Sequence, residues 1–112
     1  MGLDQYIYAE TDSDKDLELA YWRKHPNLHG WMLKHLKAKE DSNCENLYLS
    51  VEDIDAAINA VQNFDLPETS GFFFGKSYMD NEERNYTLEN LNKVKKYFLD
   101  NPKAKVYYFA WW

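Results

Sequence analysis

The segment AYWRKHPNLHGW, residues 20 to 31, gathers most of the side chains in this sequence that could do chemistry. Arg23 can bind an anion, His29 can move a proton near neutral pH, and each tryptophan offers an indole N–H and a flat ring. One interpretation is structural, with Arg23 buried beneath an aromatic cluster and paired with Asp4 of a neighbouring strand, because buried charges are usually paired. The other is a concave pocket for a ligand. Its candidate residues are Trp22, Arg23, His29, Trp31 and Trp111.

These residues complete neither a catalytic nor a metal-binding motif. His29 with Asp4 is a candidate acid–base pair for a small hydrolase, but no oxyanion-binding donor accompanies it, so we predict no catalytic residue. His25 and His29 have the spacing of a zinc-binding helix, yet Pro26 stands where the zinc-hydrolase motif has glutamate. The calcium-loop pattern that begins at residue 12 fails at its glycine and glutamate positions. We therefore expect no bound metal and no cofactor.

Two further motifs fail on spacing. GFFFGKS, residues 71 to 77, ends like a phosphate-binding loop, but three residues separate its glycines where the motif has four. Three phenylalanines instead favour a buried strand. LPETSG, residues 66 to 71, resembles a sortase signal, but Ser70 separates the threonine from the glycine. Cys44 is the single cysteine, which excludes an internal disulfide, and the sequence shows no base that would activate its thiol.

Composition indicates one folded, acidic domain spanning residues 1–112. Hydrophobic residues make up 45% of the chain and aromatic residues 17%, which excludes disorder by composition. The net charge of −6 makes a poor nucleic-acid binder and suits either a basic partner or plain solubility. No apolar stretch approaches the roughly 20 residues of a membrane helix, and MGLDQYIYAE does not resemble a signal peptide. We expect a cytoplasmic protein that binds neither nucleic acid nor membrane.

Hydrophobic periodicity predicts an α+β fold with a mixed sheet of about four to five strands and about three helices packed on it, in the order β-β-α-β-α-β-α-β. The expected strands are 3–9, 17–23, 46–50, 71–75 and 105–112, and the expected helices are 26–39, 51–61 and 87–102. Segment 17–23 also fits a helix, but Pro26 favours a strand that ends before a helix. If 17–23 is a strand, Arg23 shares the parity of Leu17 and Tyr21, and we expect it to point inward. The predicted inner stripe of helix 26–39 is Leu28, Trp31, Met32, His35 and Leu36.

Four ordered motifs resemble one family of small proteins carried by bacteriophages, prophages and bacteria. They are MGLD-Y at the start, AYWRKHPNLHGWM near residue 20, LPETSGFFFG in the middle and VYY--WW at the end. The resemblance runs from end to end and implies a phage-borne accessory protein, without implying any catalytic residue. The chain departs from it at Phe109 and Ala110, where relatives tend to have small or acidic polar residues.

The leading hypothesis is a non-enzymatic accessory protein, of phage or prophage origin, that binds a host protein. The alternative is a protein that binds or sequesters a small, nucleotide-like ligand, with Arg23 holding its anion and a tryptophan stacking on its ring. The small hydrolase that uses His29 with Asp4 is the third hypothesis.

Overall fold

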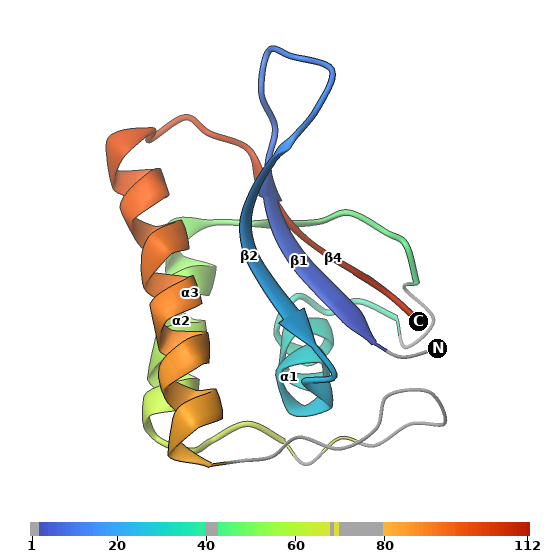
Figure 1. The fold of residues 1–112 in the computed structure, drawn as a ribbon, viewed down its shortest axis with the longest axis vertical. Coiled ribbons are helices and arrows are strands. Elements are labelled where there is room, and N and C mark those ends of the chain that lie inside the picture. The colour runs from blue at the N-terminus through green and yellow to red at the C-terminus, as the bar shows by residue number, and fades with distance from the viewer. Residues whose placement is uncertain (1–2, 40–42, 68, 70–79) are drawn as a thin grey trace.

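The computed structural model of the chain describes residues 3–39, 43–67, 69 and 80–112, and these form an α+β domain with its helices on one face of a sheet (Figure 1). The radius of gyration is 13.2 Å, close to the roughly 13 Å expected for one domain of about this size. The α+β prediction is confirmed, and the strand predicted at 71–75 lies outside the described residues. The elements are β1 (Asp4–Ala9), β2 (Leu17–Arg23), α1 (Pro26–His35), β3 (Leu47–Leu49), α2 (Val51–Gln62), α3 (Asn81–Asp100) and β4 (Val106–Trp111).

The four described strands lie in the order β2-β1-β4-β3, and each described pairing is antiparallel, where the sequence predicted a mixed sheet. Segment 17–23 is a strand, as Pro26 indicated. Side chains alternate between the two faces of the sheet along each strand. On the inner face, Ile7 lies between Ala20 of β2 and Tyr108 of β4 in the register of the strands.

A β-bulge decides which face of β2 points inward. The register between β1 and β2 shifts between Ile7 and Tyr8, which leaves Leu19 as an extra residue. Beyond the bulge, Trp22 takes the inner position and is 2% exposed, while Arg23 lies on the opposite face and is exposed. The prediction that Arg23 points inward is therefore wrong, because the large indole ring occupies the core side of this strand.

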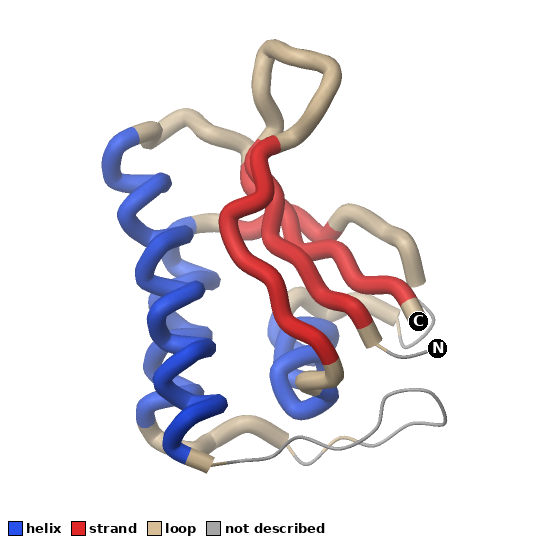
Figure 2. Tube along the Cα trace, viewed as in Figure 1, coloured by secondary structure: helices blue, strands red, loops and turns tan. Residues whose placement is uncertain are grey.

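The three described helices cover the inner face and share one hydrophobic core with the sheet (Figure 2). On α1, Leu28 and Met32 are fully buried, as predicted, but Trp31 is only partly buried and His35 lies at the surface. The helix ends at His35 rather than at residue 39. Lys37 has a positive φ of 55°, which lies outside helical geometry.

Capping residues set the starts of α2 and α3. Ser50 and Asp53 form the reciprocal capping box that their spacing indicates. Helix α3 begins at Asn81, six residues before the predicted start, because the Asp80 side chain accepts a hydrogen bond from the Glu83 backbone N–H. Carboxylates in a first helical turn also interact favourably with the helix dipole.

Helix α3 packs beside the outer edge of β2. The backbone carbonyl of Tyr21 accepts hydrogen bonds from the Tyr86 hydroxyl at 2.7 Å and from Asn90 Nδ2 at 3.1 Å. Nearby, Trp22 Nε1 donates to Thr87 Oγ1 at 3.1 Å. Side chains of a helix thus occupy hydrogen-bonding groups that an open strand edge leaves free.

Candidate functional site

The five residues predicted to form a ligand pocket do not come together. Trp22 and His29 are buried between the sheet and the helices, at 2% and 1% exposure. Arg23 and Trp111 lie on the opposite face of the sheet, and Trp31 lies on α1. A pocket that combines an Arg23 guanidinium with these rings is therefore not formed.

The predicted structural pair of Asp4 and Arg23 is also not formed. The two residues face each other across β1 and β2, but Asp4 Oδ1 accepts a hydrogen bond from the Tyr21 hydroxyl at 2.8 Å instead. Arg23 is exposed, so water solvates its charge and it needs no buried partner. Asp4 and His29 lie on opposite faces of the sheet, which separates the acid–base pair of the hydrolase hypothesis.

A buried polar network lies where the predicted pocket was expected. The Tyr108 hydroxyl is bonded to His29 Nδ1 at 2.8 Å and accepts from Gln5 Nε2 at 3.1 Å. Gln5 also donates to the His25 backbone carbonyl and accepts from the His25 backbone N–H. Burial lowers the pKa of His29 to about 4 and raises the pKa of Tyr108. These groups are therefore neutral at pH 7 and join β1, β4 and the start of α1.

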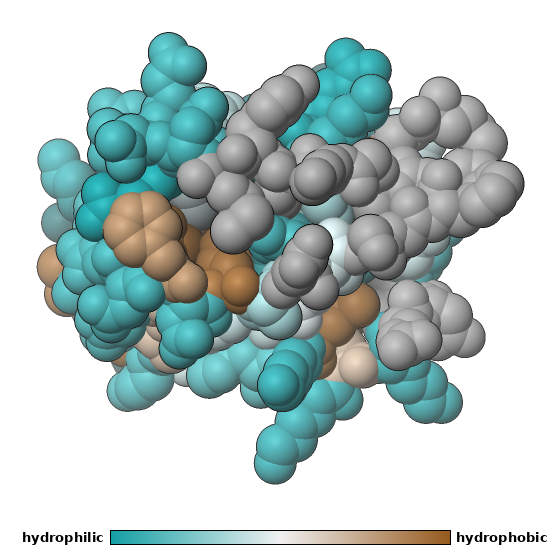
Figure 3. All heavy atoms as spheres, turned by 90° about the horizontal axis from the view of Figure 1, so that it is seen from below, coloured by the Kyte–Doolittle hydropathy of each residue, from teal (hydrophilic) through white to brown (hydrophobic). Residues whose placement is uncertain are grey.

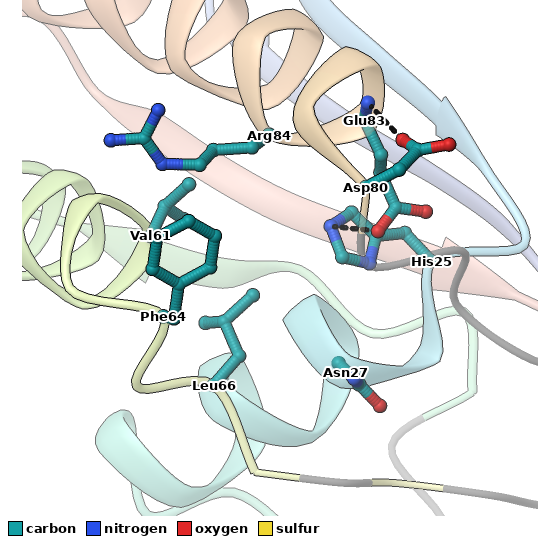
Figure 4. Close-up of a pocket in the computed structure, with 8 residues that line it drawn as sticks. All are labelled: His25, Asn27, Val61, Phe64, Leu66, Asp80, Glu83 and Arg84. Atoms are coloured by element: carbon teal, nitrogen blue, oxygen red, sulfur yellow. Dashed lines mark hydrogen bonds and ion pairs between the residues drawn. The ribbon is translucent and has the colours of Figure 1, made fainter.

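A narrow hollow lies beside His25, between α1, the end of α2 and the start of α3 (Figure 4). His25 Nε2 lies 3.7 Å from Glu83 Oε1, and the Arg84 guanidinium lies 5.0 Å from the centre of the Phe64 ring. Burial lowers the pKa of His25, and the Glu83 carboxylate opposes that shift. The hollow has a volume of about 40 Å³, room for a few water molecules and too small for a nucleobase.

The described residues around the hollow are mainly polar and form no metal-binding cluster. Seen from below, the described residues at this end are mainly hydrophilic, with small apolar patches between them (Figure 3). Among the described residues, no cluster of three or more His, Cys, Asp or Glu side chains could hold a metal ion. His25 is 4% exposed, so little of its ring reaches the surface.

Trp31 lines a separate, open groove of about 390 Å³ between α1 and residues 65–67. Its ring stacks on His35 with the ring centres 4.5 Å apart and the planes 10° from parallel. His35 Nε2 in turn lies 2.9 Å from Asp53 Oδ1. Lys34 and Asp65 add one side chain of each charge to the lining of the groove. The volume falls within the range of small-ligand pockets, about 300–1,000 Å³.

Among the described residues, aromatic side chains gather most extensively on the face of the sheet opposite the helices, which we call the tyrosine face. The register places on it Asp4, Tyr6, Tyr8, Glu18, Tyr21, Arg23, Tyr48, Tyr107, Phe109 and Trp111. Neighbouring rings lie 5.0 to 6.5 Å apart between centres, from Tyr21 through Tyr6 and Tyr8 to Phe109. Tyr48 and Trp111 are 54% and 47% exposed. None of the described helices packs on this face.

Carboxylates at the rim hold the tyrosine hydroxyls. The Tyr21 hydroxyl donates to Asp4, and this bond, together with burial, raises the pKa of Tyr21 to about 12. The Tyr107 hydroxyl donates to Asp16, and burial and this carboxylate raise its pKa. Hydrogen bonding to Glu10 raises the pKa of Tyr48. The rings are therefore neutral at pH 7, and acidic side chains at their edges carry negative charge.

The sequence contains a pattern that indicates the tyrosine face, although the predicted site included none of its tyrosines. In DQYIYA, Tyr6 and Tyr8 alternate with Ile7, and in VYYFAW, Tyr107 and Phe109 alternate with inward residues. This two-residue period places aromatic side chains on a second face.

Comparisons of the chain find no matching family model, no similar curated protein and no similar solved structure.

Proposed function

We propose that the chain is a non-enzymatic accessory protein, of the phage- or prophage-borne kind that its motifs resemble, and that it binds a host protein through the tyrosine face. It acts in the cytoplasm of the bacterial host. The observation that carries the proposal is a broad aromatic face with no described helix on it. In the part of the chain that the structure describes, no helix is long and apolar enough to cross a membrane.

The composition of the tyrosine face supports this proposal. Tyrosine, tryptophan, phenylalanine and arginine are the side chains enriched at protein–protein interfaces and at their energetic hot spots. Tyr48, Trp111 and Arg23 are exposed, and Tyr6, Tyr8 and Phe109 are partly exposed beside them. The hydrogen bond to Asp4 holds Tyr21 in place, so a partner meets a ring that is already ordered, and less side-chain entropy is lost on binding. Tyr107, which donates to Asp16, is buried and packs against the rings of Tyr8 and Tyr48.

Crosslinking in lysate of the bacterium that carries the gene tests the proposal. At its natural expression level the wild-type chain should capture one dominant host protein. A chain with both Tyr48→Ser and Trp111→Ser should lose that protein, because the two substitutions remove the most exposed rings of the tyrosine face. Both side chains point away from the core, so circular dichroism should show an unchanged fold.

Phe64→Ser is the matched control. Phe64 is 65% exposed and belongs to the hollow beside His25, away from the tyrosine face. This variant should capture the same host protein as the wild type. If no partner is captured, or if the control loses it as completely as the double variant, the proposal is wrong.

The groove at Trp31 supports small-ligand binding as a second candidate function. Its volume suits a nucleotide-like molecule, and Lys34 could bind an anionic group. Native mass spectrometry of the gently purified protein would then show a small added mass, and Trp31→Ala would remove it. A bare chain in this measurement counts against the second candidate and leaves the first untouched.

A further inference from the structure

The tyrosine face combines aromatic rings with acidic groups in a regular pattern across three strands. One row of the register holds Arg23, Asp4 and Trp111, the next Tyr21, Tyr6 and Phe109, and the third Glu18, Tyr8 and Tyr107, with Tyr48 beyond Tyr107. Carboxylates therefore stand in the first and third rows, and the row between them is entirely aromatic. This is the chemistry that recognises cations on a partner chain.

The carboxylates retain the capacity to bind further groups. Each carboxylate has two oxygens and about four lone-pair sites, and the Tyr21 hydroxyl uses one site on Asp4. Tyr107 likewise donates one hydrogen bond to Asp16. Glu18 is exposed beside Tyr8, where its negative charge contributes to raising the pKa of that tyrosine. A guanidinium that approaches a ring thus meets a carboxylate with free acceptor sites.

We infer that the host partner, whose existence rests on the proposed function, presents an arginine-rich basic segment that lies across the tyrosine face. Guanidinium groups stack on the tyrosine rings and donate hydrogen bonds to the Asp4, Asp16 and Glu18 carboxylates. Arginine suits this face better than lysine because its planar group stacks on aromatic rings and binds carboxylates through two parallel hydrogen bonds.

The negative charge of the tyrosine face also disfavours nucleic acid, anionic lipid or a second copy of the chain as its binding partner. A phosphate backbone or an anionic lipid surface brings negative charge against Asp4, Glu10, Asp16 and Glu18. A second copy of the chain brings the same carboxylates against themselves, in a molecule whose net charge is already −6. Arg23, the cation on the first row, sits beside Asp4 and leaves the third row acidic.

A peptide series tests the inference on the full chain. Three short peptides alternate serine with arginine, with lysine or with glutamine, so that every second side chain can face the sheet. Titration at low salt, followed by backbone amide NMR shifts, should show the arginine peptide perturbing β1, β2 and β4. The lysine peptide should bind several-fold more weakly, and the glutamine peptide should not bind.

Substitutions test whether the arginine peptide binds at the tyrosine face. Glu18→Gln and Tyr48→Ser should each weaken the arginine peptide about two- to fivefold, the factor typical of one exposed ion pair or cation–π contact. Glu89→Gln, an exposed carboxylate on α3, and Phe64→Ser are the matched controls and should leave the affinity unchanged.

The inference is overturned if the glutamine peptide binds equally well, if the perturbed amides lie on the helices, or if the controls weaken binding as much as Glu18→Gln. Binding of an oligonucleotide, or dimerisation of the free chain through the tyrosine face, also overturns it. The proposed function and this inference can be refuted independently of each other. If the lysate partner depends on Tyr48 and Trp111 but the arginine peptide does not bind, host-protein binding stands and the basic segment is wrong.

Discussion

Tyr108 shows how one hydroxyl can order a buried core. Its oxygen bridges Gln5 Nε2 of the neighbouring strand and His29 Nδ1 of α1. A buried polar group without a partner costs about 1–3 kcal/mol, so this arrangement requires all three groups to be present. Part of it was predictable, because Gln5 shares its parity with Ile7 and Ala9 and therefore points inward. The bridge itself was not, because Gln5 and Tyr108 are far apart in the chain and meet only when β1 pairs with β4.

The burial of His29 makes the stability of the fold pH-dependent. Its pKa is about 4 in the fold and 6.5 in an exposed histidine, so the unfolded chain takes up the proton first as the pH falls. This contribution to the free energy of unfolding is fully present above about pH 6.5 and decreases down to about pH 4. The expected loss is about 3–4 kcal/mol, at about 1.4 kcal/mol per tenfold change in proton affinity.

Urea unfolding at a series of pH values measures this loss. His29→Gln should have a shallower pH dependence between those limits than the wild type, whatever its absolute stability. Some slope remains, because burial lowers the pKa of His25 in the same direction. An identical slope in the variant would show that the His29 proton is not the cause.

At the scale of elements, the local sequence predicted which helices and strands are present better than it predicted where each one begins and ends. The helix predicted to begin at residue 87 leaves out the polar run DNEERNY, although Asp80 and Glu83 have the spacing of a helix cap. The inward face of β2 was misassigned because a bulge depends on the partner strand, which local periodicity does not include. Four described strands and three described helices nevertheless lie where periodicity placed them, with ends that differ from the predicted ones by up to six residues.

The contact between α1 and the segment that follows α2 depends on one glycine. A Cβ at Gly30 would collide with the Thr69 side chain, while the Thr69 N–H donates to Asn27 Oδ1 at 2.8 Å. Gly30→Ala should therefore destabilise the fold by about 1–3 kcal/mol, as overpacked sites do, although alanine favours a helix more than glycine does. Urea unfolding measures the change.

A double variant identifies the cause. Thr69→Gly removes the obstructing atoms, so Gly30→Ala with Thr69→Gly should be more stable than the sum of the two single effects predicts. Additive effects would mean that the two residues are not in contact. A Gly30→Ala chain as stable as the wild type would contradict the close approach itself.

At the scale of the whole molecule, the sheet separates two kinds of aromatic side chain. Trp22 is buried on the helical side and Trp111 is exposed on the other. The sequence predicted a sheet with helices packed on it, but not which aromatics remain outside, because β4 is aromatic on both faces. Only the pairing of β4 with β1 assigns Tyr108 to the core and Phe109 to the surface.

Acrylamide quenching of tryptophan fluorescence tests this separation. Trp111→Phe should remove a readily quenched component and lower the average quenching constant, because acrylamide reaches an exposed ring. Trp22→Phe should leave that component in place. If Trp22→Phe lowers quenching and Trp111→Phe does not, the two faces have been assigned the wrong way round.

The hydrogen bonds that α3 makes to the Tyr21 carbonyl have a consequence for how any partner can approach. Many proteins recruit another chain by adding it as one more strand at a sheet edge. Tyr86 and Asn90 occupy the Tyr21 carbonyl on the β2 edge, and the opposite edge of the described sheet, β3, has three residues. A partner of the proposed kind would therefore bind broadside, through contacts between side chains, and single surface substitutions would change its specificity while the backbone hydrogen bonds of the sheet stay intact.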